Sequence, residues 1–425
     1  PPSPPLSLSL SLPPLLARSL LSSLSPSPLP SYTAFSLFSP LLFSPSSFLC
    51  PFGYLASDVK RYDRQIRLWG LDTQRGLLGT RVLLLRASGL CDEAAKNLVL
   101  AGVGHVSIQD PDTVTADDLA IGGAFSLRST DIGRNKAEAM VEHLQPMNPS
   151  VEMDALTQPL ASLPDEKLRQ FHFIIGTHGI DAVHELIECE KRLSTGVVAN
   201  GGSRKRPREV EKVAKTNGTH VLLPMRAAEQ LPKMIACGTL GMFGFCALDL
   251  LHNVHTLVTK NAGSADANAT TAQYQIAYPT IADAFSVDWA SLEPRAQRLY
   301  CAIQLLMASK DPEEAEKLRE TWLAEAGLTE TFLTQRLSAD FVEQVAKGVG
   351  VELSPICAIM GGMVAAEVIK IISGRDAPIN NLLLLDAATP SDAAGVTVRY
   401  GPAFQSDNGI NNGLPKLVAE AGEQE

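Results

Sequence analysis

The stretch RVLLLRASGLCDEAAKNLVLAGVGHVSIQD, which spans residues 81–110, decides the fold. Its first residues, Arg81–Leu85, are mostly leucine and valine and predict a buried strand. Helical spacing of apolar residues follows over Asp92–Ala101, and His105–Gln109 predicts a second strand that ends at Asp110. A strand, a turn, a helix and a second strand in this order form the basic unit of a doubly wound α/β sheet.

The same alternation continues along the chain. Gly133–Leu144 predicts a helix that stops before Pro146. Phe171–Ile175 then predicts a strand, and Asp181–Leu193 predicts a further helix. Helices that alternate with strands in this way cover both faces of a mainly parallel sheet. We therefore expect an α/β fold of the Rossmann-like type.

The second half of the chain interrupts this pattern and then completes it. Residues 234–251 are strand-like with several glycines, and residues 286–348 are charged with helical periodicity, which predicts a small α-helical insert. An apolar helix over Pro355–Ile372, stopped at Gly374, and a strand over Asn381–Asp386 close the domain. The expected organisation begins with a low-complexity segment (1–57) and the first part of the α/β domain (58–285), which contains loops or insertions at 194–233 and 261–275. The helical insert (286–350), the closing helix and strands (351–402) and an acidic tail (403–425) follow.

Residues 1–57 are expected to lie outside the fold. They are nearly all serine, proline and leucine, and Arg18 is their only charge. Proline opposes both helices and central strands, and the segment lacks the arginines of a transit peptide and the single apolar core of a signal peptide. The chain begins with Pro1, and its first methionine is Met140. We therefore expect a disordered or artefactual segment, from a fragment or an over-extended gene prediction, with a genuine targeting segment as the alternative.

Charge and cysteine usage argue against several classes of protein. A net charge of -10 disfavours a general nucleic-acid binder, which needs a basic face to neutralise phosphates. No apolar run is long enough and free enough of proline to cross a bilayer. The seven cysteines are scattered and include no C-x-x-C pair, which favours buried thiols in a reducing compartment over disulfides or zinc. We expect no metal site.

The most specific motif is YDRQIRLWG, at Tyr62–Gly70. With the strand, turn and helix that follow it, the motif resembles the amino-terminal signature of the ThiF/MoeB and ubiquitin-activating superfamily. GRNKAEA at 133–139 and the closing stretch at 354–386 follow in the order of that family. Over roughly 58–193 and 234–402, the chain is similar to the small, non-cysteine-bearing subunits of heterodimeric activating enzymes for ubiquitin-like modifiers, with SUMO as the favoured modifier.

This resemblance implies a ThiF-type adenylation domain. In that family, ATP and magnesium convert the carboxyl-terminal glycine of the modifier into an acyl-adenylate, and a cysteine thiol captures it as a thioester. Such a site needs backbone amides for the phosphates, a carboxylate for the ribose and cations for the developing phosphate charge.

Much of this nucleotide site is expected to be lost. The glycine-rich turn of the family falls on RASGLC, where Gly89 remains but Arg86 and Cys91 add side chains that obstruct a pyrophosphate. Asp110 is retained at the place of the ribose ligand, and Lys136 at the place of a later lysine. The positions of the family's catalytic asparagine, arginine and aspartate fall on Ala120, Gly123 and Gly179, with Asp181 two residues further on. We therefore expect a vestigial cofactor site at Gly89, Asp110 and Lys136.

Arg64 is the expected catalytic residue. The resemblance implies a dimeric adenylation unit in which the arginine of the amino-terminal motif reaches the partner's nucleotide. A guanidinium group suits this role because it stays charged and presents a fork of donors to phosphate oxygens. The structural alternative is a salt bridge within the helix, to Asp63 or a neighbour, and Arg67 is expected to serve structure.

No thioester-forming cysteine is expected. The insert is short, and Cys301 lies in the apolar sequence RLYCAIQLL, where nothing nearby lowers its pKa. Cys357 lies in the apolar closing helix. ATP and magnesium are therefore expected in the site of a large, cysteine-bearing partner subunit. A SUMO-type modifier is the second expected partner, and we expect no binding to nucleic acid or membrane.

Other interpretations stay open. The basic sequence RKRPREVEK at 204–212 predicts either a nuclear import signal or a solvated loop, so we expect a location in the nucleus, with the cytoplasm as a second location. The corresponding neddylation subunit and a non-catalytic Rossmann-like scaffold are alternatives. An oxidoreductase would need the intact glycine turn that Arg86 and Cys91 replace.

Overall fold

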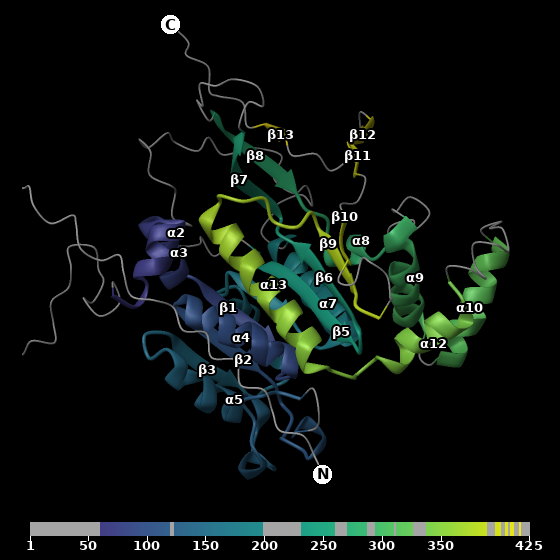
Figure 1. The fold of residues 1–425 in the computed structure, drawn as a ribbon, viewed down its shortest axis with the longest axis horizontal. Coiled ribbons are helices and arrows are strands. Elements are labelled where there is room, and N and C mark those ends of the chain that lie inside the picture. The colour runs from purple at the N-terminus through teal and green to yellow at the C-terminus, as the bar shows by residue number, and fades with distance from the viewer. Residues whose placement is uncertain are drawn as a thin grey trace, which may run out of the picture.

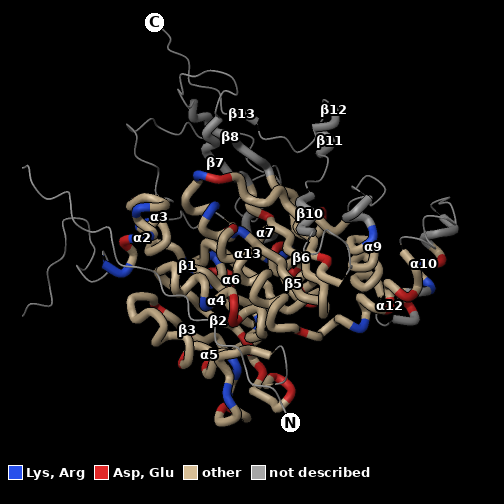
Figure 2. Tube along the Cα trace, viewed as in Figure 1, with Lys and Arg blue, Asp and Glu red and all other residues tan. Residues whose placement is uncertain are grey.

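A computed structural model describes residues 60–119, 123–198, 231–259, 270–286, 294–309, 312–325, 337–388, 396–400, 404–406, 409–411 and 416–417. The expectations for residues 1–57, for the basic cluster at 204–212 and for Ala120 lie outside these ranges. Among the described residues, lysines and arginines are interspersed with aspartates and glutamates along the chain (Figure 2).

One mixed sheet of eight strands lies at the centre of the molecule (Figure 1). The strands are β1 (Arg81–Leu85), β2 (His105–Gln109), β3 (Glu152–Leu156), β4 (Phe173–Gly176), β5 (Lys233–Leu240), β6 (Phe243–Asp249), β9 (Leu382–Asp386) and β10 (Val396–Tyr400). Their order is β10-β9-β6-β5-β4-β1-β2-β3, and the pairings from β3 to β5 are all parallel. The pairings from β5 to β10 are antiparallel. The expected α/β class with a mainly parallel sheet is confirmed.

Two layers of helices cover the sheet and enclose two hydrophobic cores. The first layer contains α3 (Leu71–Leu78), α4 (Gly89–Ala101), α5 (Lys136–Leu144) and α13 (Ser354–Ser373). The opposite layer contains α7 (Gly179–Val198), α8 (Ile281–Ala284), α9 (Pro294–Ala308) and α12 (Ala339–Lys347). In Figure 1, α13 and α4 lie side by side in front of the sheet.

The remaining elements lie at the margins of this body. The short helix α2 (Asp63–Trp69) contacts α3, and α10 (Pro312–Glu325) packs with α9 and α12 in the region expected to be a helical insert (Figure 1). Two small sheets complete the described structure: β7 (His252–Thr259) with β8 (Thr270–Ala277) and β13 (Lys416–Leu417), and β11 (Phe404–Ser406) with β12 (Gly409–Asn411).

The predicted element boundaries hold best where the local signals are strong. The predicted strands at 81–85 and 105–109 coincide with β1 and β2. The helix predicted from Gly133 begins at Lys136, because Asn135 caps it by accepting a hydrogen bond from Glu138 N. The strand-like stretch 234–251 is a hairpin of β5 and β6, with Gly241 at a φ of 61° in its turn. The edge strand β3 was not predicted, because its side chains are mostly part-exposed and give no buried apolar run.

The contact between α13 and α4 depends on a glycine. A Cβ atom at Gly361 would lie 2.7 Å from Glu93 Cβ and 2.8 Å from Ala94 N, so only glycine permits this close approach. Of the described helices, α13 alone is long and apolar enough to cross a membrane, but half of its apolar stretch is buried within the protein. The apolar character of α13 is therefore accounted for in part by core packing.

Candidate functional site

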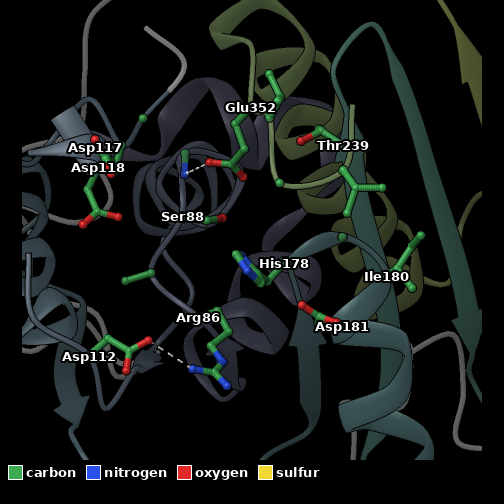
Figure 3. A pocket seen from close by; sticks show the side chains of 18 of the residues that line it. Arg86, Ser88, Asp112, Asp117, Asp118, His178, Ile180, Asp181, Thr239 and Glu352 are labelled. Atoms are coloured by element: carbon green, nitrogen blue, oxygen red, sulfur yellow. Dashed lines mark hydrogen bonds and ion pairs between the residues drawn. The ribbon is translucent and has the colours of Figure 1, made fainter. Parts of the chain in front are cut away.

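A cavity of about 600 Å³ opens beside the turn that joins β1 to α4 (Figure 3). Ligands of open α/β sheets bind in this position, outside the carboxyl ends of the parallel strands. The cavity is lined by residues from the β1–α4 turn, the loop after β2, the start of α7 and the segment before α13. Gly89, Asp110 and Lys136, the three expected cofactor residues, all line it, as do Gly123, Gly179 and Asp181.

Arg86 takes the first position of the turn in an unusual backbone conformation. Its φ of 67° lies in the left-handed region, which favours glycine. The side chain crosses to α7, where Nε and Nη2 donate to Glu185 Oε1 at 3.1 and 2.7 Å. Nη1 lies 3.4 Å from Asp112 Oδ2 (Figure 3). The guanidinium group is therefore held by two carboxylates of its own chain.

Glu352 supplies a carboxylate to the start of α4. Gly89 N donates to Glu352 Oε2 at 2.5 Å (Figure 3). Leu90 N donates to Oε1 of the same carboxylate at 3.3 Å. These N–H groups have no partner within the helix, and the positive end of the helix dipole lies at the same place. Burial raises the pKa of Glu352, and the two backbone hydrogen bonds oppose that rise. The carboxylate thus occupies the position at which a helix N-terminus of this kind holds a phosphate.

Asp110 and Lys136 are also engaged within the chain. Asp110 is 2% exposed, and its two carboxylate oxygens accept hydrogen bonds from Ala87 N at 2.8 Å and Asp112 N at 2.9 Å. Burial raises the pKa of Asp110. Lys136 Nζ lies 2.7 Å from Asp118 Oδ1. Both residues therefore organise the loop after β2 in this structure.

The cavity lining carries an excess of negative charge. Six carboxylate side chains line it, from Asp110, Asp112, Asp117, Asp118, Asp181 and Glu352. Its cationic side chains are those of Arg86 and Lys136, and the histidines are His178 and His184. An anionic polyphosphate would experience net repulsion in such a lining.

Arg64 is not part of this cavity. It is exposed on α2, and within the described ranges it makes no hydrogen bond or ion pair. Asp63, its neighbour, pairs instead with Arg67, whose Nε lies 3.1 Å from Asp63 Oδ2. The alternative of a salt bridge between Arg64 and Asp63 is therefore wrong.

The cysteines of the described residues are all buried. Cys301 on α9 is 2% exposed, and Cys357 on α13 is 1% exposed, as expected for core thiols. Burial raises the pKa of Cys357 to about 12. Cys91, which follows the glycine-rich turn, is also fully buried. Among the described residues, no thiol is accessible for thioester formation.

Two residues that shape the site, Glu185 and Glu352, were not predicted from the sequence. Glu185 lies in a helix with other acidic residues, and only its contact with Arg86 distinguishes it. Glu352 is separated from Gly89 by 263 positions. In the sequence, Glu352 is marked only by its position directly before the closing helix, and that position does not indicate a contact with Gly89.

This fold, with its mainly parallel sheet and its cavity beside the first β–α turn, is that of the ThiF family. Residues 62–399 match that family, and the chain belongs to it. The chain is similar to SUMO-activating enzyme subunit 1 of Homo sapiens, with 29% identity over 366 residues that cover 79% of this chain and 93% of that protein. The protein of the same name from Danio rerio is 29% identical over 358 residues, 77% of this chain and 92% of that protein. DNA damage tolerance protein rad31 of Schizosaccharomyces pombe is 26% identical over 337 residues, 78% of this chain and 94% of that protein.

Proposed function

We propose that this chain is the small subunit of a heterodimeric SUMO-activating enzyme. Its similarity to SUMO-activating enzyme subunit 1 over 93% of the human protein supports a place in an activating enzyme for ubiquitin-like modifiers. In this proposal the chain supports ATP-dependent adenylation of the carboxyl terminus of SUMO. The activated modifier is then transferred to a cysteine of the large partner subunit.

The observation that carries the pseudo-adenylation role is the carboxylate of Glu352 at the start of α4. A triphosphate does not fit this turn, because its anion position is taken by Glu352 and Arg86 replaces a glycine that the family uses for close approach. Binding of ATP and magnesium is therefore assigned to the partner subunit. The burial of the described thiols supports assigning the thioester cysteine to the partner as well.

The chain's own chemical contribution is assigned to Arg64. Its guanidinium group is exposed and unpaired within the described residues, so it is available to a partner's phosphates. The outer face of α13 offers a second contact surface, with Ala358, Ile359 and Ala366 exposed. We place the enzyme in the nucleus, on the strength of the basic cluster at 204–208.

The proposal is tested by ATP–pyrophosphate exchange and by thioester formation. The chain alone should show no exchange with SUMO, and addition of the large subunit should establish both exchange and a thioester on that subunit. Exchange by the chain alone would contradict the pseudo-adenylation role. Thioester formation with the neddylation modifier in preference to SUMO would contradict the choice of modifier.

A further inference from the structure

The segment that carries Glu352 is fixed by contacts that do not involve the carboxylate. Gly241 N, in the β5–β6 turn, donates to Val351 O at 3.0 Å. A Cβ atom at Gly348 would lie 2.4 Å from Leu240 O, so the segment runs directly against this turn. Glu352 is therefore presented to α4 by packed backbone, and its side chain does not have to be ordered from a free loop.

The N–H groups that Glu352 binds belong to a thirteen-residue helix whose other early donors are already satisfied. Ser88 Oγ caps α4 by accepting from Cys91 N at 3.2 Å. Asp92 N donates to Ser88 O at 2.9 Å. The donors left for an external anion are those of Gly89 and Leu90, and Glu352 accepts from both.

We propose that Glu352 is a built-in anion that substitutes for a bound phosphate at the vestigial nucleotide turn. The role rests on the proposed pseudo-adenylation function and extends it by naming the residue that closes the turn. Glu352 satisfies the start of α4 in the absence of nucleotide and, with the acidic lining, excludes phosphate groups from the cavity. The residue that determines the ligand preference of this pocket is thus contributed by the segment before the closing helix.

The test is anion rescue of thermal stability in the full chain. Glu352→Ala leaves Gly89 N and Leu90 N without an acceptor and should lower the melting temperature by about 2–4 °C. Inorganic phosphate, added at constant ionic strength against chloride, should restore most of this loss. Glu352→Gln keeps one carbonyl acceptor without the charge. Its melting temperature should therefore fall less than that of Glu352→Ala and should rise less on addition of phosphate.

The matched control is Glu343→Ala, which removes an exposed glutamate of α12 that pairs with Lys347. Wild type and Glu343→Ala should respond equally and weakly to phosphate, which measures the non-specific effect of the salt. The proposal is overturned if Glu352→Ala is as stable as Glu343→Ala, or if phosphate stabilises wild type as much as Glu352→Ala. Neither measurement involves SUMO or a partner, so this result and the test of the proposed function can fail independently.

Discussion

Asp63 and Arg67 form an ion pair one helical turn apart on α2, with 3.1 Å between Oδ2 and Nε. This pair distinguishes two neighbouring arginines by their contacts, a distinction that the sequence alone leaves open. Arg67 is bound within its own helix, whereas Arg64 projects from the same helix without a partner among the described residues. An exposed ion pair of this kind contributes at most about 1 kcal/mol to stability, so loss of the Arg67 pair should have little effect on folding.

Arg64→Ala should slow adenylate formation by the assembled enzyme by about 10–100-fold, the value of one charge-assisted hydrogen bond in the transition state. Heterodimer assembly and the melting temperature should stay unchanged, because the exposed side chain makes no hydrogen bond or ion pair within the described residues. Pyrophosphate exchange and analytical gel filtration provide the measurements. Arg67→Ala is the matched control and should leave the rate near that of wild type; equal rates for both variants would refute the assignment of Arg64.

The left-handed backbone conformation of Arg86 should produce a difference in unfolding free energy between two variants at this position. Arg86→Gly and Arg86→Ala both remove the ion pairs to Glu185 and Asp112, so these losses cancel in the comparison. Glycine adopts a φ of 67° without strain, whereas alanine in this conformation is destabilised by about 1 kcal/mol. Chemical denaturation should therefore find Arg86→Gly more stable than Arg86→Ala by about that amount. An Ala variant of equal or greater stability would show that this position is unstrained.

Two adjacent glycines of α13 should respond in opposite ways to alanine. Gly361→Ala places a methyl group against the backbone of α4 and should destabilise the chain by about 1–3 kcal/mol. Gly362→Ala has no atom within 4 Å of the new methyl group and should be neutral or stabilising by up to about 1 kcal/mol. Urea unfolding of both variants measures the difference, and equal effects would contradict the described packing of α13 on α4.

The edge of the sheet should carry a pH-dependent contribution to stability. His105 Nε2 on β2 lies 2.5 Å from Asp154 Oδ1 on β3, and His105 Nδ1 lies 3.2 Å from Glu152 Oε2 on the same strand. The hydrogen bond to Asp154 raises the pKa of His105. A group whose pKa is raised by folding contributes stability that is fully present below its unfolded pKa of about 6.5 and is lost as the pH rises through the folded value.

His105→Gln should therefore cost more unfolding free energy at about pH 6 than at about pH 9. Denaturant titrations of wild type and variant at the two pH values give the comparison. Both measurements stay above the acid range in which Asp154 titrates, since its pKa is lowered by the hydrogen bonds from His105 and Ser107 despite its burial. A cost that is the same at both values would mean that His105 is not charged between these carboxylates.

Local sequence was sufficient for much of the α/β framework. The valine and leucine run of β1 and the capped helix α5 are determined by residues next to one another in the chain, because side-chain periodicity and capping act over a few positions. The replacement of turn glycines by Arg86 and Cys91, and the absence of a C-x-x-C pair, were likewise visible from residue identity alone. The edge strand β3 lacks such a signal, since most of its side chains are part-exposed and it is defined by its pairing with β2.

The sequence by itself determined the family of this protein and the residues of its altered turn, whereas the role of Arg64 stays a prediction. Only the tertiary structure decided that Glu185 holds Arg86 and that Glu352 closes the start of α4. Each of these two contacts joins segments about a hundred or more residues apart, from Arg86 to Glu185 and from Gly89 to Glu352. Their partners are chosen by the packing of separate helices onto one sheet, and no local pattern encodes that choice.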